Sequence, residues 1–142
     1  MKRVKAILAT KGNDIFSIAP DASVYDAIHL LAEKEIGALL VMDGPLMVGI
    51  LSERDYARQI ILKGRSSEET KVREIMTTNV LHATPDNDTG ECMTIMTKNR
   101  IRHLPVIDDS EVVGVISIGD LVRSIIAEQE STIGDLRKYI SG

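Results

Sequence analysis

The chain contains two similar copies of one sequence segment. Residues 20–58 align with residues 85–123 at a constant offset of 65 and without a gap, and eleven of the 39 aligned pairs are identical. Many of the other pairs exchange one apolar residue for another, as Ile28 does with Met93. A repeat unit usually buries its apolar face only against a neighbouring unit. Two copies therefore predict a closed pseudo-symmetric pair.

Each copy predicts the same order of elements. In the first copy, Ser23 and Asp26 form a capping box ahead of an apolar stripe at helical spacing. The elements expected there are a strand over 15–19, a helix over 24–35, strands over 38–42 and 47–51, and a helix from Ser52 to about Lys63. Their counterparts are a strand over 80–83, a helix from Asp88 to about Asn99 with Glu91 completing its capping box, strands over 103–107 and 112–116, and a helix from Ser117 to about Glu128.

These elements give an α+β fold of two pseudo-symmetric β-α-β-β-α repeats, packed sheet to sheet. We divide the chain into repeat 1 (1–64), a linker (65–71), repeat 2 (72–130) and a C-terminal helix (131–142). A short apolar stretch precedes each copy, at 4–8 and 72–76, with an offset of 68. The first copy thus carries three extra residues around Lys11. In the last helix, Ile133, Leu136 and Ile140 form a stripe that we expect to pack on the body or on a partner.

Composition argues against several classes of function. The chain has a net charge of −4, a pI near 5.4, three Tyr, one Phe and no Trp. It lacks the basic footprint and the exposed rings of nucleic-acid-binding proteins. The longest apolar run is far shorter than the ~20 residues of a membrane helix, and the N-terminus does not resemble a signal peptide. With Cys92 as its single cysteine, the chain is expected to be a cytoplasmic protein, without a membrane or nucleic-acid partner.

The motif Gly-x-x-Ser-x-x-Asp occurs in both copies, at 49–55 and 114–120, and the segments at 36–41 and 101–106 also correspond. With these motifs, each copy resembles the cystathionine-β-synthase (CBS) domain, and two in tandem resemble a Bateman module. The resemblance covers residues 4–128. It implies a regulatory sensor of adenine nucleotides that has no catalytic activity of its own.

The paired Ser and Asp residues suit a nucleotide on chemical grounds as well. A ribose presents two neighbouring hydroxyl donors, and an ionised carboxylate such as Asp55 or Asp120 can accept both. Ser52 and Ser117 lie one helical turn earlier, where the free amides of a helix start could also meet a phosphate. The same Ser-x-x-Asp pattern is also a plain capping box, and the two roles are compatible.

The resemblance extends the site to further residues. It implies an adenine slot, main-chain contacts from the first strands, and basic groups for the phosphates, with the cleft between the repeats as the site. The slot would be lined by Ile36, Ile50, Ile101 and Val115. The main-chain contacts would come from Phe16 and Leu81. The phosphates would meet Arg102 and His103, with Lys11 and Arg54 as further candidates.

The two candidate sites differ in sequence. Arg102 and His103 of the second copy correspond to Gly37 and Ala38 of the first, which leave room without charge. We therefore expect unequal binding: either one site holds AMP and the other a larger adenine ligand such as ATP or NAD(H), or only one site is filled. An S-adenosylmethionine-type ligand ranks lower, because Arg102 would repel its sulfonium. Arg58 and Arg123 are interpreted as solvated helix residues.

The leading hypothesis is a non-catalytic module that senses AMP, ADP, ATP or NAD(H), as a homodimer that regulates an unidentified protein in trans. The runner-up is a protein-interaction scaffold whose ligand sites are vestigial. We expect no enzyme, because no phosphate-binding Gly-rich loop or paired acid and base stands out. The three histidines have no Cys or acidic partner at metal-binding spacing, so we expect no metal.

Overall fold

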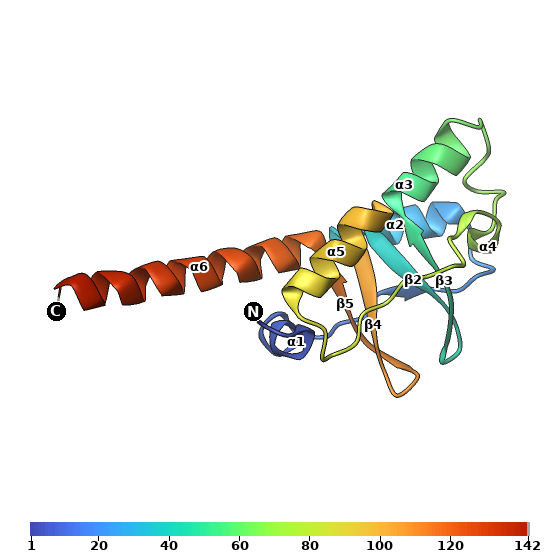
Figure 1. Cartoon of the computed structure of the whole chain (residues 1–142). Coiled ribbons are helices and arrows are strands. Elements are labelled where there is room, and N and C mark those ends of the chain that lie inside the picture. Colours follow the sequence, from blue (N-terminus) through green and yellow to red (C-terminus); the bar gives the residue numbers. More distant parts are fainter. Residues whose placement is uncertain (142) are drawn as a thin grey trace. The chain divides into compact units, whose positions relative to one another are not determined.

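The computed structural model describes residues 1–141 and shows helices combined with two small sheets (Figure 1), which confirms the predicted α+β class. In chain order, the elements are α1 (Val4–Lys11), β1 (Ser17–Ile18), α2 (Val24–Lys34), β2 (Ala38–Asp43), β3 (Leu46–Ser52), α3 (Glu53–Tyr56), the π-helix η1 (Ala57–Ile61), α4 (Val72–Ile75), α5 (Thr89–Asn99), β4 (His103–Asp108), β5 (Glu111–Ser117) and α6 (Ile118–Ser141).

The internal repeat extends to the register of the strands. One sheet has the order β1-β2-β3, with β1 parallel to β2 and β2 antiparallel to β3, and the other is the antiparallel pair β4-β5. Both hairpins carry a register shift at the same place, between Val41 and Met42 and between Val106 and Ile107. The same apolar pattern thus produces the same irregular hairpin twice.

The strand predicted over 80–83 does not form. Only Ala83 pairs with β4: its N–H donates to the Pro105 carbonyl at 2.9 Å, and its carbonyl accepts from the Ile107 N–H at 2.9 Å. The next N–H, that of Thr84, donates to the Asn87 side chain at 2.7 Å. Pro85 follows and has no N–H to offer. The chain therefore turns away from the sheet after a single bridge.

Local capping chemistry starts the helices where the sequence predicted. The Asp26 N–H donates to Ser23 Oγ at 3.0 Å at the start of α2. At the start of α5, the reciprocal box is complete, since the Glu91 N–H donates to Asp88 Oδ1 at 2.8 Å and the Asp88 N–H donates to Glu91 Oε1 at 3.1 Å. These bonds satisfy amides that have no partner within the helix.

Two predicted helices take a different form. The helix expected from Ser52 to Lys63 begins as α3 and continues as the π-helix η1, whose Ile60 is buried. The helices expected to end near Glu128 and to begin at 131 are one continuous helix, α6. No glycine or proline lies between Asp120 and Ser131 to interrupt it. The residues there have adequate helix propensity, so the helix continues without a break.

The chain forms two compact units that do not follow chain order. The first-repeat unit is Ile15–Leu81, and the second-repeat unit is Met1–Asp14 together with the residues from His82 onward. In the first-repeat unit, α4 buries Val72 and Ile75 in a core that contains Leu39. The second-repeat unit is completed by α1, which precedes the first copy in the chain.

The burial of α1 shows why it belongs with the second copy. Val4 and Ile7 are buried in the same cluster as Leu104, and the Val4 N–H donates to the Asn87 carbonyl at 2.8 Å. The equivalent bond in the other unit runs from the Val72 N–H to the Ala22 carbonyl, at 2.9 Å. Each repeat is therefore closed by a helix from the stretch that precedes the other repeat.

The glycine of each Gly-x-x-Ser-x-x-Asp motif has a packing role. A Cβ at Gly49 would lie 2.7 Å from Met76 Sδ and 2.9 Å from the Thr77 carbonyl oxygen. A Cβ at Gly114 would lie 2.8 Å from Leu8 Cδ2. Met76, directly after α4, and Leu8, within α1, are equivalent under the offset of 68. In both units an apolar side chain of the closing segment therefore lies directly against the strand.

Cys92 lies in the core of the second-repeat unit. Burial, aided by the nearby carboxylates of Glu91 and Asp88, raises the pKa of its thiol to about 11, so the thiol stays protonated at neutral pH.

Within residues 1–141, no helix is both long enough and apolar enough to cross a membrane.

Candidate functional site

The first candidate site lies where β3 passes into α3. Ser52 caps the helix, and its hydroxyl accepts from the Asp55 N–H at 3.2 Å. The Asp55 carboxylate reaches back: its Oδ2 accepts from the Ser52 N–H at 2.9 Å and from the Ser52 hydroxyl at 3.1 Å. Its other oxygen accepts from the Thr77 hydroxyl at 3.3 Å. These donors to Asp55 are all uncharged.

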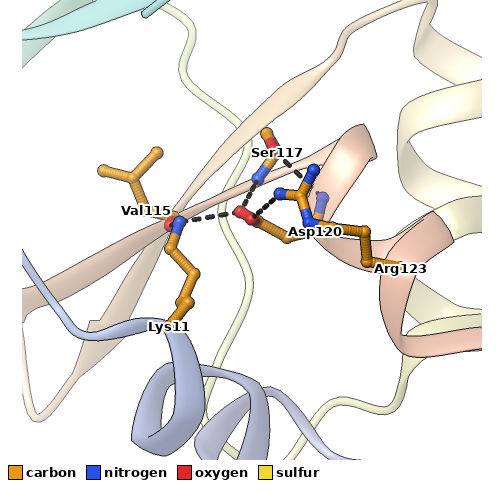
Figure 2. Close-up of polar contacts among 5 residues, drawn as sticks. All are labelled: Lys11, Val115, Ser117, Asp120 and Arg123. Atoms are coloured by element: carbon orange, nitrogen blue, oxygen red, sulfur yellow. Dashed lines mark hydrogen bonds and ion pairs between the residues drawn. The ribbon is translucent and has the colours of Figure 1, made fainter. Parts of the chain in front are cut away.

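The second candidate site, where β5 passes into α6, repeats the Ser-to-Asp geometry and adds two cations (Figure 2). The Ser117 N–H donates to Asp120 Oδ2 at 2.8 Å, and the Asp120 N–H donates to Ser117 Oγ at 3.2 Å. Lys11 Nζ lies 2.7 Å from Asp120 Oδ2 and 2.8 Å from the Val115 carbonyl. Arg123 Nη2 lies 2.7 Å from Asp120 Oδ1. We call these five residues the Asp120 cluster.

The Asp120 cluster keeps its carboxylate ionised. Asp120 is only 7% exposed, and burial, the largest single effect, raises its pKa. The Lys11 ammonium and the hydrogen bonds from Ser117 act in the opposite direction and outweigh burial, so the pKa of Asp120 lies below its usual 3.8. The folded protein therefore stabilises the ionised form of Asp120 more than water does.

This lowered pKa predicts a pH-dependent contribution to stability. The contribution is fully present above pH 3.8 and is lost as pH falls through the lower folded-state pKa of Asp120. At pH 7, Asp120→Asn should lower the unfolding free energy by about 1–3 kcal/mol, because Lys11 and Arg123 lose a charged partner. Urea unfolding at pH 7 and at about pH 2.5 measures the difference in unfolding free energy between wild type and variant. This difference should become smaller in acid. A difference that is constant with pH would contradict the assignment.

The backbone next to each serine brings further predicted residues to the two sites. Ala38 lies opposite Ser52 in the β2-β3 pairing, and His103 lies opposite Ser117 in the β4-β5 pairing. The carbonyl of Gly37 accepts from the Glu53 N–H at 3.0 Å, and that of Arg102 accepts from the Ile118 N–H at 2.8 Å. The side chain of the Arg102 residue is exposed. The uncharged pair and the basic pair therefore occupy equivalent positions.

The predicted apolar and first-strand residues of the first-repeat unit lie at the edges of its core. Phe16 and Ile36 are half-buried against that core. The Phe16 carbonyl accepts from the Leu40 N–H at 3.2 Å, and the Lys34 ammonium lies 5.6 Å from the centre of the Phe16 ring. Ile50 exchanges two backbone hydrogen bonds with Thr77, both 2.9 Å long. The sheet therefore already uses the Phe16 carbonyl, which was predicted to contact a base, and the segment after α4 uses the backbone of Ile50, which was predicted to line the adenine slot.

The remaining predicted residues each lie within one of the two units. Ile101 is half-buried against the core of the second-repeat unit, and Val115 is half-buried in β5. Leu81 is 38% exposed at the end of the first-repeat unit. Arg54 is an exposed residue of α3, one position before Asp55.

The sequence interpretation missed two partners of the aspartates. Arg123, expected to be solvated, is bound to Asp120, although its side chain is 72% exposed. The spacing of three between Asp120 and Arg123 on a helix could have indicated this ion pair. Thr77 binds Asp55 from a distant segment, and no local pattern indicated it. Lys11, one of the three extra residues of the first copy, was a candidate, but its pairing with Asp120 was not foreseen.

The described residues contain no group of three or more His, Cys, Asp or Glu side chains able to hold a metal ion.

The fold and the site define a tandem-repeat protein with two equivalent serine–aspartate helix starts. The CBS domain profile matches this chain twice, over residues 4–62 and 72–127. The chain belongs to the CBS domain family, in which CBS domain pairs are typically regulatory or signal-transduction proteins.

Curated relatives cover most of this chain. It is 42% identical over 127 residues to the CBS domain-containing protein CBSX3, mitochondrial, of Arabidopsis thaliana, a match that covers 86% of this chain and 62% of that protein. It is 28% identical over 121 residues to the CBS domain-containing protein YhcV of Bacillus subtilis, covering 85% of this chain and 84% of that protein. The chain therefore spans less than two thirds of the Arabidopsis relative.

Solved structures share the fold. A Burkholderia ambifaria protein with CBS domains is 52% identical, with a TM-score of 0.88, covering 90% of this chain and 96% of that chain. The CBS domain pair of protein MJ0100 is 26% identical, with a TM-score of 0.75, covering 90% of this chain and 98% of that chain. That pair was solved in complex with 5-methylthioadenosine and S-adenosyl-L-methionine.

Proposed function

We propose that this chain is a non-catalytic regulatory module that senses an adenine nucleotide, namely AMP, ADP, ATP or NAD(H), at the serine–aspartate helix starts of its repeats. The observation that carries the proposal is the geometry of Asp55, whose carboxylate accepts hydrogen bonds at a helix start from the uncharged groups of Ser52 and Thr77. A carboxylate in that setting can exchange weak hydroxyl contacts for the paired hydroxyls of a ribose. The MJ0100 domain pair, which holds two adenosine compounds, supports the same ligand class.

The ligand's base and phosphates have matching groups near each helix start. Ile36 and Ile50 in one repeat, and Ile101 and Val115 in the other, offer apolar surface for an adenine ring. Arg102 and His103 in the second repeat offer positive or polar groups to phosphates, as Arg54 does in the first. Gly37 and Ala38 leave the equivalent place in the first repeat uncharged. We therefore propose that the two repeats bind different adenine ligands, or bind one ligand with unequal affinity.

The Asp120 cluster favours phosphate over sulfonium in the second repeat. Lys11 and Arg123 both lie within 2.7 Å of the Asp120 carboxylate, so a sugar must compete with two cations for that acceptor. A phosphate group can instead draw these cations to itself, because they form charge-assisted bonds with either anion. A sulfonium gains nothing from them. We therefore rank S-adenosylmethionine below the nucleotides for this chain.

Titration of the purified full chain with adenine ligands tests the proposal. We expect AMP, ATP or NAD⁺ to bind by calorimetry and to raise the melting temperature, since a ligand at ~100 times its Kd adds about 2.7 kcal/mol of stability. Guanosine monophosphate and S-adenosylmethionine serve as controls for the base and for the charge. Recovery of unchanged nucleotide after incubation would support a role without catalysis. If no adenine compound binds, the scaffold alternative with vestigial sites replaces the proposal.

Regulation then requires that the ligand bind two arrangements of the protein with different affinities, because a ligand shifts an equilibrium only by that difference. The name of the Burkholderia ambifaria relative assigns it provisionally to signal transduction. We propose the same role here, with a homodimer as the working form and an unidentified protein as the regulated partner. The cytoplasm is the expected compartment, although the Arabidopsis relative carries a mitochondrial name.

A further inference from the structure

The outer half of α6 carries large apolar side chains that the described chain leaves exposed. Ile126 and Ile133 are each 49% exposed, Leu136 is 56% exposed and Ile140 is 81% exposed. The sequence predicted that the last three would pack on the body or on a partner. In the structure Leu136 and Ile140 stay largely exposed, and Ile133 is half-exposed beside a pocket that Met1 also lines. Figure 1 shows α6 continuing as one straight helix well past α5, against which only its first part packs.

The exposed side chains follow a coiled-coil repeat. The positions 122, 126, 129, 133, 136 and 140 are separated by alternating steps of four and three residues. In heptad notation, the a positions are Ile126, Ile133 and Ile140, and the d positions are Val122, Gln129 and Leu136. This regular spacing is the seam along which two helices pair. An amphipathic helix that covers its own domain typically has a wider apolar face.

The end of α6 has little to stabilise it within a single chain. A helix of fewer than ~12–15 residues is marginal in water without tertiary packing, and most side chains after Gln129 are exposed. Gly134 lies inside this stretch, and a Cβ built there meets no atom within 4 Å. A glycine inside a helix costs about 1 kcal/mol relative to alanine. A continuous helix through this stretch therefore calls for an external partner.

We propose that the occupant of this seam is α6 of a second copy of the same chain, paired in parallel as a short two-stranded coiled coil. Ile at the a positions with Leu at d, as at Leu136, is the combination that favours two strands in a parallel coiled coil. The single polar seam residue, Gln129, would lie opposite its own copy, where two side-chain amides can hydrogen-bond to each other. A buried polar pair of this kind fixes register at some cost in stability.

The charges beside the seam discriminate between the two orientations. The e positions are Arg123, Glu130 and Arg137. An antiparallel pair that matches all six seam positions would place Glu130 against Glu130 of the other copy, and Arg123 against Arg137. Like charges at such distances are unfavourable. In a parallel pair each e residue lies beside a g residue instead, and the g residues at 125, 132 and 139 are all uncharged.

Cysteine cross-linking of the full chain tests both contact and orientation. Leu136→Cys places a thiol at a d position, which faces its own copy only in the parallel, in-register pair. Ser131→Cys is the matched control, because position 131 lies on the opposite face of the helix. With oxidised glutathione, Leu136→Cys should form a disulfide-linked dimer at least ten times faster than Ser131→Cys. The native Cys92 is buried and stays in both variants.

Equal rates for the two cysteine variants would overturn the proposal. Preferential cross-linking of Leu136→Cys to Ile126→Cys in a mixture would also overturn it, since those positions meet in the antiparallel pair.

Sedimentation equilibrium gives an independent measurement. The double variant Ile133→Asp/Leu136→Asp should raise the Kd of the dimer at least tenfold relative to Ala127→Asp/Ser131→Asp. The control adds the same two charges to exposed positions outside the seam. Both pairs of substitutions lie outside the buried core of the second-repeat unit, so unchanged melting of the repeats checks that folding is intact. Equal Kd values in the two double variants would overturn the proposal.

Discussion

Asp55→Ala is expected to weaken binding of the preferred adenine nucleotide by about 10- to 100-fold. A hydrogen bond to a charged group is worth about 1.5–3 kcal/mol, and each 1.4 kcal/mol is about tenfold in Kd. The structure supports a large effect, because Asp55 is half-buried and its contacts with Ser52 and Thr77 involve no cation that a ribose would have to displace. Calorimetric titration of wild type and variant with the same nucleotide measures the change.

Glu53→Ala is the matched control for this substitution. Glu53 is an exposed acid on the same turn of α3, so its removal changes the local charge equally without removing the proposed ribose acceptor. Asp55→Ala also breaks a capping box, which costs about 1 kcal/mol of stability, and thermal unfolding must show that the variant is folded. Equal affinities for Asp55→Ala, Glu53→Ala and wild type would remove Asp55 from the site.

The equivalent change in the second repeat, Asp120→Ala, is expected to reduce affinity less. Lys11 and Arg123 already occupy the Asp120 carboxylate, so the wild-type site must break those contacts before a ribose can use it. The substitution also releases both cations toward a phosphate. A larger loss for Asp120→Ala than for Asp55→Ala would show that the ion pairs do not limit the second site.

Leu104→Ala is expected to destabilise the second-repeat unit by about 2–5 kcal/mol, the usual cost of deleting a large buried aliphatic side chain. Leu104 is fully buried in a cluster with Val4 and Ile7 of α1. Amide hydrogen exchange through opening of that unit should accelerate about thirtyfold for a loss of 2 kcal/mol. The acceleration should therefore include α1, which is remote from Leu104 in the sequence.

Leu39→Ala is the internal control, since Leu39 holds the equivalent position in the other repeat. It is buried with Val72 and Ile75 of α4, so its removal should accelerate exchange in α4 and leave α1 the less affected helix. If α1 instead followed Leu39→Ala and α4 followed Leu104→Ala, the assignment of the two closing helices to their units would be wrong.

The elements that depend on near neighbours in the chain were predictable. The helix that follows Ser23 and the helix that follows Asp88 begin where their caps indicated, and both hairpins lie within two residues of the predicted strands. Periodicity and capping act over a few residues, so the local sequence carries them. The strand over 80–83 failed because its backbone needed a distant partner, which only Ala83 reached.

The candidate site was predictable only in part. The serine–aspartate pairs follow from a spacing of three residues, and the structure shows their reciprocal hydrogen bonds in both repeats. The partners of the aspartates come from elsewhere: Thr77 from the segment after α4, and Lys11 from the end of α1. Spacing along the chain cannot show such pairings, since they depend on which helix closes which repeat.

The sequence alone thus determined the duplication, the elements of each copy and the positions of Ser52, Asp55, Ser117 and Asp120, because each rests on interactions between residues close in the chain. Tertiary structure alone decided that α1 completes the second repeat and α4 the first. It also decided that Lys11 and Arg123 pair with Asp120, whereas the uncharged hydroxyl of Thr77 binds Asp55. The physical reason is that burial and ion pairing join surfaces that meet only after the chain has folded.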